Sequence, residues 1–159
     1  MKAFLTGTFV RAVDDKRRIA IPKTWREALK WSADSIAYMA PGTDGSLALY
    51  PEQAFSELAN RLAQKSPTAQ DVRAFSRLFY GQAQRVEVDG QGRVRIPQEL
   101  FDLVSLGTEP VLIGVGDYLE IWNRDRWEAY QAAQQKHYDE IAESAFDKSP
   151  HSSTESNCD

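Results

Sequence analysis

Basic side chains gather near the start of this 159-residue chain, around the segment DDKRRIAIP at residues 14–22. Arginine can form paired hydrogen bonds with guanine, and lysine supplies a compact positive charge that suits phosphate. A strand, a charged turn and a second strand form a ribbon that the major groove of B-DNA can admit. These residue types in this order therefore favour binding to DNA. The candidate contacts are Arg11, Lys16, Arg17, Arg18 and Lys23.

The segment recurs 75 residues later as DGQGRVRIP, at residues 89–97. Both copies begin with Asp, have Arg at the fifth position and end with Ile-Pro. The second copy is less basic, because Gly90, Gln91 and Gly92 replace the charged residues of the first. We therefore expect the first turn to supply most of the DNA affinity and the second to serve folding and assembly. Two further candidate contacts come from the second copy, Arg93 and Arg95.

The Asp–Arg pairs also have a purely structural interpretation. Asp and Arg four residues apart can form an ion pair that pins a tight turn. We favour this role over DNA contact for Arg93, whereas for Arg18 the two interpretations are equally supported and both can hold. The residues that we expect to build the turns are Asp14, Asp89, Gly92, Pro22 and Pro97.

The charge is distributed unevenly along the chain. The net charge is -4, yet residues 1–31 contain eight basic and three acidic residues, a local charge of +5 against -9 for the remainder. The field close to a surface depends on the local charge rather than on the total. A basic patch on an acidic body is therefore compatible with DNA binding.

Other chemistries have little support in the sequence. Both histidines and the only cysteine, at positions 137, 151 and 158, lie late in the chain and offer no nucleophile–base pair and no metal-ligand spacing. The Gly114-Val115-Gly116 segment leads into a predicted strand, which favours a turn over a phosphate-binding loop. No apolar run approaches the ~18 residues of a membrane span. We expect a cytoplasmic protein without enzymatic activity, metal or cofactor, and without a membrane partner.

The repeat extends to the elements that must position the two turns. Short branched or aromatic runs predict strands at residues 8–13, 19–21, 36–39, 47–50, 84–88, 94–96, 111–115 and 119–122. Apolar side chains at helical spacing predict helices at residues 23–31, 51–65, 68–80 and 97–106, and a final helix after Asn123.

These elements predict an α+β fold made of two pseudo-symmetric βαββα-type repeats. Each half has strands too few and too short for a stable sheet of its own, so the halves should pack as one barrel-like body about a pseudo-two-fold axis. We expect the first repeat at residues 1–66, a connecting helix at 67–81, and the second repeat with its C-terminal helix at 82–143. The polar, Ser-rich segment 144–159 is expected to be disordered.

The doubled D-x-x-x-R turn and its flanking segments closely resemble the MraZ family, within the AbrB-like swapped-hairpin group of transcription factors. The resemblance covers roughly residues 1–135 and rests on Ile21-Pro22, Leu49-Tyr50-Pro51, Ile96-Pro97, Gly114-Val115-Gly116 and Glu120-Ile121-Trp122. It implies a swapped-hairpin β-barrel with peripheral helices. It also implies a nucleoid-associated homo-oligomeric ring that binds short direct repeats in double-stranded promoter DNA and regulates its own division and cell-wall operon.

One position departs from the family's D-x-K-G-R pattern, because Arg17 stands where that pattern has glycine. If the turn needs a left-handed backbone there, arginine costs about 1 kcal/mol relative to glycine. Either the turn has another shape, or the extra charge offsets the strain by touching phosphate.

The alternative function is a protein-interaction module of the antitoxin-like type in the same group, without specific DNA binding. Steep salt dependence of DNA binding would favour the regulator.

Overall fold

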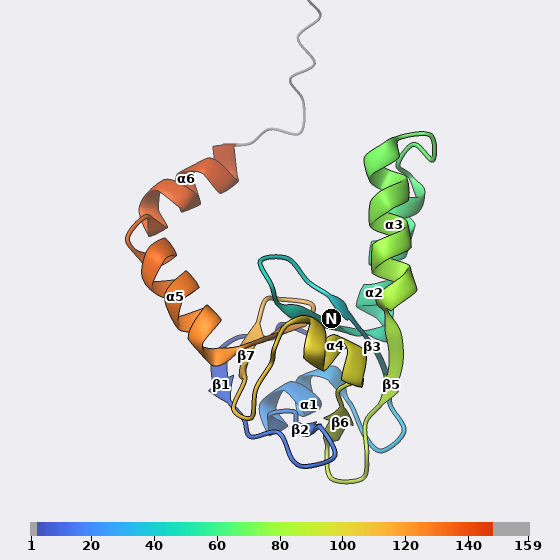
Figure 1. Ribbon diagram of the computed structural model, residues 1–159, viewed down its shortest axis with the longest axis vertical. Helices are drawn as coiled ribbons and strands as arrows, with labels where there is room; N and C mark the ends of the chain where they lie inside the picture. Colours follow the sequence, from blue (N-terminus) through green and yellow to red (C-terminus); the bar gives the residue numbers. More distant parts are fainter. Residues whose placement is uncertain (1–2, 148–159) are drawn as a thin grey trace, which may run out of the picture. The chain divides into compact units, whose positions relative to one another are not determined.

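The computed structural model describes residues 3–147 as a mixed α+β protein with antiparallel sheets (Figure 1). Among these described residues, those up to Trp127 form one compact unit, and those from Glu128 to Asp147 belong to a second. The strands are β1 (Thr8–Val10), β2 (Arg18–Ala20), β3 (Ile36–Pro41), β4 (Leu47–Pro51), β5 (Gln84–Glu87), β6 (Arg93–Arg95), β7 (Val111–Gly114) and β8 (Leu119–Trp122). The helices are α1 (Lys23–Leu29), α2 (Glu52–Ala63), α3 (Gln70–Gln82), α4 (Gln98–Leu103), α5 (Arg124–Gln135) and α6 (Tyr138–Asp147).

The strands of the two repeats interleave. The larger sheet has six strands in the order β1-β7-β8-β4-β3-β5, and β2 pairs with β6 in a separate two-stranded ribbon. Four of the pairings, β1–β7, β4–β8, β3–β5 and β2–β6, join a strand of one repeat to a strand of the other. Only β3–β4 and β7–β8 are hairpins within a repeat. The expectation that neither half forms a sheet alone agrees with this pairing.

The register shows where the pseudo-two-fold axis passes. Ile19 pairs with Val94, its own counterpart 75 residues later, at the centre of the β2–β6 ribbon. Ala48 likewise pairs with Glu120, its counterpart 72 residues later, where β4 meets β8. Each strand therefore lies beside its own repeat copy at these two points, as a two-fold relation between the halves requires.

The closed barrel expected from the family resemblance is not what the structure shows. The six-stranded sheet is open, with β1 and β5 at its edges, and the ribbon forms a separate sheet. The strands β2 and β6 are only three residues long, and a single bridge between Val13 and Ile19 connects the ribbon to the preceding segment. Strands this short cannot carry continuous pairing around a barrel.

One face of the large sheet forms the main core with the ribbon. Ile19 and Val94 of the ribbon belong to the same buried cluster as Leu47 and Leu49 of β4. Trp25 of α1 completes this cluster, and its indole Nε1 donates a hydrogen bond to the Thr6 carbonyl over 2.8 Å. The ribbon is thus supported from beneath by close-packed apolar side chains.

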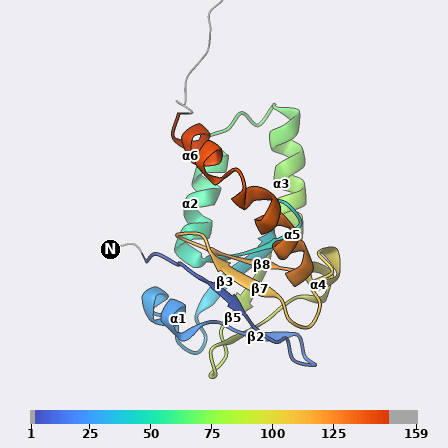
Figure 2. The same ribbon diagram turned by 90° about the vertical axis from the view of Figure 1, so that its left-hand side faces the viewer.

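Helices α2 and α3 stand side by side over the other face of the sheet (Figure 2). Aromatic rings join them to it: Tyr38 of β3 stacks on Phe55 of α2 at 4.3 Å between ring centroids, and Tyr50 of β4 meets Phe79 of α3 at 6.1 Å. No helix among residues 3–147 is both long enough and apolar enough to cross a membrane.

Proline sets the start of three helices, as the sequence predicts. Pro22, Pro51 and Pro97 each occupy the position directly before the first helical residue of α1, α2 and α4. Their fixed φ suits this place, where the missing N–H is not needed.

Helix α6 changes the expected end of the chain. It includes residues 144–147, which the sequence analysis assigned to a disordered tail, while residues 148–159 lie outside the described part. The polar composition concealed Ile141, Ala142, Ala145 and Phe146, which recur at helical spacing. Because α6 follows α5 as α3 follows α2, the helix that we interpreted as a connector has a counterpart in the second repeat.

Candidate nucleic-acid interface

The two Asp–Arg turns meet at the β2–β6 ribbon. Arg18 lies opposite Arg95, and Ala20 lies opposite Arg93. Since Ile19 and Val94 point into the core, these flanking side chains lie on the opposite, solvent-facing side of the ribbon. The ribbon thus takes one strand from each repeat, whereas the sequence analysis expected a reader made from one strand–turn–strand of the first repeat.

Each turn is pinned by its aspartate in the same way. Asp14 Oδ1 accepts hydrogen bonds from the backbone N–H groups of Lys16 and Arg18 at 3.0 and 2.8 Å, and its Oδ2 accepts one from Arg18 Nε at 2.7 Å. Asp89 repeats this pattern with Gln91 and Arg93, and all three distances are 2.9 Å. This geometry is what a turn-building role for both aspartates requires.

The same contacts keep both carboxylates ionised. The backbone N–H of Arg18, more than its guanidinium, lowers the pKa of Asp14 below the ordinary value. Burial opposes ionisation of Asp89, but hydrogen bonds from the Arg93 and Gln91 N–H groups and from the Arg93 side chain still lower its pKa. Arg93 Nη1 also lies 3.8 Å from Asp14 Oδ2, so one carboxylate connects the two turns.

The candidate cations on this surface fall into two groups, those paired with an aspartate and those without an ion pair. Arg18 and Arg93 are only 27% and 26% exposed in their side chains, and each is held by an aspartate. The side chains of Arg95 and Lys16 are exposed, and within residues 3–147 neither makes an ion pair. Arg95 of the ribbon and Lys16 of the first turn would therefore break no ion pair of the described residues on binding an anion.

The remaining candidates from the first repeat lie beside the ribbon. Lys23, at the start of α1, is exposed and lies 3.8 Å from the carboxylate of Glu27. Arg11 is half-buried; it donates to the Val10 carbonyl at 3.1 Å and lies over the Phe9 ring. Surface pairs of this kind are weak, so Lys23 remains able to exchange its partner.

The chain matches one family model twice, over residues 4–78 and 79–149, and that model describes the antitoxin-like MraZ protein. The chain belongs to the MraZ family. Each matched range includes one of the Asp–Arg turns, and the second includes α5 and α6. The resemblance inferred from the two turns is therefore confirmed.

Several relatives in the MraZ family share most of this chain. A protein named Transcriptional regulator MraZ from Alkaliphilus oremlandii is 39% identical over 136 residues, which cover 86% of this chain and 92% of the relative. Its namesake from Ligilactobacillus salivarius is 36% identical over 141 residues, covering 89% and 96%. The one from Thermomicrobium roseum is 38% identical over 123 residues, covering 77% and 84%.

The departure from the MraZ pattern at Arg17 does not alter the turn. Arg17 has φ +59°, and Gly92 at the equivalent position has φ +75°. Their N–H groups donate to the carbonyls of Asp14 and Asp89 over the same 3.0 Å. Of the two explanations offered for Arg17, a differently shaped turn is thus wrong, and the arginine does occupy a left-handed backbone conformation.

The Arg17 side chain reaches across to the second repeat. Its Nε donates a 3.1 Å hydrogen bond to the carbonyl of Ile96, whose own N–H donates to the Arg17 carbonyl at 2.8 Å. The equivalent carbonyl of the first repeat, on Ile21, accepts from Arg26 Nε at 3.0 Å. In each repeat, the carbonyl of the isoleucine before proline thus accepts a hydrogen bond from one arginine side chain.

The two capping arginines come from different positions of the repeat. Arg26 lies on α1, and the position 75 residues later is Phe101, which has no guanidinium. A Cβ on Gly92 would lie 2.6 Å from the Arg26 guanidinium, so the second turn leaves space for that side chain. Because α4 has Phe101 at this position, the carbonyl of Ile96 receives its hydrogen bond from Arg17 of the first turn instead. This exchange could not be predicted from the sequence alone, because it depends on pairing between the repeats.

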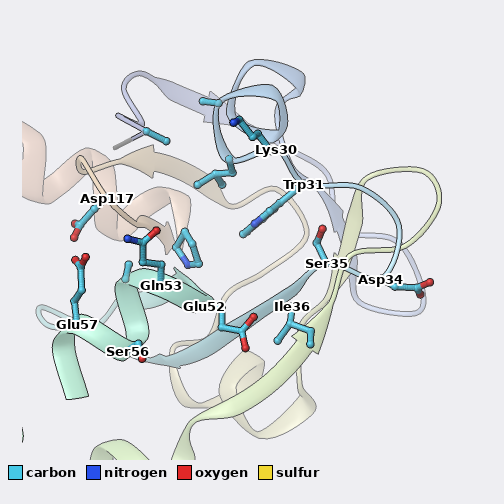
Figure 3. A pocket seen from close by; sticks show the side chains of 15 residues that line it. Lys30, Trp31, Asp34, Ser35, Ile36, Glu52, Gln53, Ser56, Glu57 and Asp117 are labelled. Atoms are coloured by element: carbon cyan, nitrogen blue, oxygen red, sulfur yellow. The ribbon is translucent and has the colours of Figure 1, made fainter. Parts of the chain in front are cut away.

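A groove on the compact unit is lined by no residue of the ribbon. It has a volume of about 840 Å³ and lies between the end of α1, the start of β3 and the start of α2 (Figure 3). Figure 3 shows Glu57 of α2 and Asp117 of the β7–β8 turn near one another on its wall, with Lys30 and Trp31 from the end of α1. No cluster of metal-binding side chains occurs within residues 3–147. Nothing in this groove resembles a nucleophile with its base.

Proposed function

We propose that this chain is a sequence-specific DNA-binding transcriptional regulator whose β2–β6 ribbon enters the major groove. The observation that carries the proposal is the pairing of Arg18 with Arg95, beside Arg93, on the exposed face of that ribbon. A two-stranded ribbon is narrow enough for the major groove. The names of the family relatives, all transcriptional regulators, support the same class of function.

Within this proposal the cations have different tasks. Arg95 and Lys16 contact the DNA directly, because their side chains are exposed and unpaired within residues 3–147. Arg18 and Arg93 hold the turns through their aspartates and add positive potential to the surface. Both repeats therefore contribute to one DNA-reading surface. This differs from the expectation, based on composition, that the first turn supplies most of the DNA affinity.

The targets that we propose are short direct repeats in the promoter of the chain's own division and cell-wall operon, read by a ring-like homo-oligomer on the nucleoid. One ribbon spans only a few base pairs, so a single copy binds weakly. Several identical copies on evenly spaced repeats raise the overall affinity, since each binding event increases the effective concentration of the next reader.

The test is a footprint and a titration on the DNA upstream of the gene. We expect evenly spaced protected repeats and an affinity that falls steeply with salt. Arg95→Ala should weaken binding by about tenfold to hundredfold, as loss of a base contact does. Arg85→Ala is the matched control, because Arg85 is an exposed arginine of β5 paired with Glu87. A blank footprint, or equal losses in both variants, would overturn the proposal.

A second candidate function is a protein-interaction module, favoured by the antitoxin-like description of the family. In that case the acidic body rather than the ribbon would carry the activity. Binding to promoter DNA that is absent or insensitive to salt would favour this alternative.

A further inference from the structure

A groove is lined by residues of α2, of α3 and of the segment that joins them. It has a volume of about 390 Å³ and lies beside the turn that joins the two helices. Its charged lining residues, Lys65, Arg73 and Arg77, are all basic. Its apolar lining consists of Ala59, Leu62, Ala63, Pro67, Val72 and the ring of Tyr80.

Helix α6 has the opposite character. Tyr138, Ile141, Ala142, Ala145 and Phe146 recur at the spacing of one helical face. Tyr138, Ile141 and Phe146 are 64%, 44% and 91% exposed. The charged residues of α6 are all acidic, namely Asp139, Glu140, Glu143 and Asp147.

We propose that α6 of one chain docks in the α2–α3 groove of a second copy of this chain. The apolar stripe of α6 would cover the groove's apolar lining, and its acidic residues would face the basic rim. On a helix, Asp139 and Glu143 lie one turn apart along one edge of the stripe, where they can reach Arg73 and Arg77. The ten residues of α6 span about 15 Å, a length suited to a groove between two helices.

This contact would be the interface between neighbouring copies in the oligomer. It therefore rests on the proposed function, which includes that oligomer. The groove and α6 are different surfaces, so each docked copy still presents one of each. A contact of this heterologous kind repeats from copy to copy until the assembly closes. Salt screens the attraction between exposed charges of α6 and of the groove. Burial of the apolar stripe must therefore supply most of the affinity.

The experiment measures the mass of the full chain by sedimentation velocity and native mass spectrometry. We expect an assembly for the wild type and a shift toward the 17.9 kDa of one chain for Arg73→Glu/Arg77→Glu. The same shift is expected for Asp139→Lys/Glu143→Lys, and combining all four changes should restore assembly. Ile141→Asp/Phe146→Asp, at exposed positions, tests the apolar stripe without disturbing a core.

The matched control is Arg85→Glu/Lys30→Glu, which makes the same change in charge at exposed positions outside the groove and should leave the mass unaltered. Circular dichroism confirms that each variant is folded. A monomeric wild type, assembly that survives the groove variant, or failure of the fourfold variant to reassemble would overturn the docking. Binding of dissociated variants to a single DNA repeat is measured separately, so failure of the docking and failure of DNA recognition give different results.

Discussion

Replacing Arg17 with glycine tests whether its guanidinium stabilises the two-turn ribbon. The change restores the MraZ pattern and removes a side chain from a backbone at φ +59°. It also removes the hydrogen bond from Arg17 Nε to the carbonyl of Ile96, a residue with 0% exposure. Strain relief and loss of the hydrogen bond act in opposite directions, so the sign of the effect decides which is larger.

The magnitudes favour the hydrogen bond. Relief of the left-handed conformation stabilises by about 1 kcal/mol. Losing a hydrogen bond from a charged donor costs about 1.5–3 kcal/mol, and a glycine gives the unfolded chain further freedom worth roughly 0.5 kcal/mol. We therefore expect Arg17→Gly to lower the free energy of unfolding by about 1–2.5 kcal/mol, a drop in Tm of several degrees.

Urea unfolding at one fixed protein concentration measures this change, because the proposed assembly would make stability depend on concentration. Adding Phe101→Arg to the glycine variant places a guanidinium at the position equivalent to Arg26, and should recover part of the loss. An Arg17→Gly variant more stable than the wild type would refute the capping role. A slope of log K against log salt that becomes shallower by about one would show that Arg17 contacts phosphate.

Three further predictions concern the turns and the sheet. Gly92→Ala should destabilise by roughly 1 kcal/mol or more in urea unfolding, because its φ of +75° disfavours a side chain and its Cβ would displace the Arg26 guanidinium; no loss would mean that Arg26 is not held there. Burial raises the pKa of Glu120, so its carboxylate costs stability as the pH rises above the unfolded value, and Glu120→Gln should raise the urea midpoint at pH 7 but not at pH 4. The lowered pKa values of Asp14 and Asp89 mean that their stabilisation is complete above the unfolded value and lost as the pH falls through the folded one. Acid titration followed by circular dichroism should thus show a steeper loss below pH 4 for the wild type than for Asp14→Asn/Asp89→Asn, and identical profiles would contradict the assignment.

Much of the fold could be predicted because its signals are local. Three prolines mark helix starts, alternating or branched runs mark strands, and the 75-residue spacing relates the two halves. The pinning of each turn by Asp14 or Asp89 also follows from spacing within one short segment. These features depend on residues a few positions apart, so a single sequence contains them.

The remaining features depend on partners distant in sequence. Nothing local says that Arg95 lies opposite Arg18 or that Arg17 reaches Ile96, because both contacts follow from how the repeats pair. The exposed positions of α6 were hidden for another reason. Small and acidic residues dominate the segment, and its apolar stripe becomes apparent only when the backbone is helical.

The interleaving of strands also fixes the order in which this chain can fold during synthesis. Strand β4 receives its second neighbour only when β8 exists, and β1 has no sheet partner before β7. A nascent first repeat therefore presents unpaired strand edges until Trp122 has been made, which is most of the way along the chain. Pairings so distant in sequence slow folding and leave such edges open to other chains. The feature that joins the two Asp–Arg turns into one surface thus makes the growing polypeptide dependent on protection until its second half arrives.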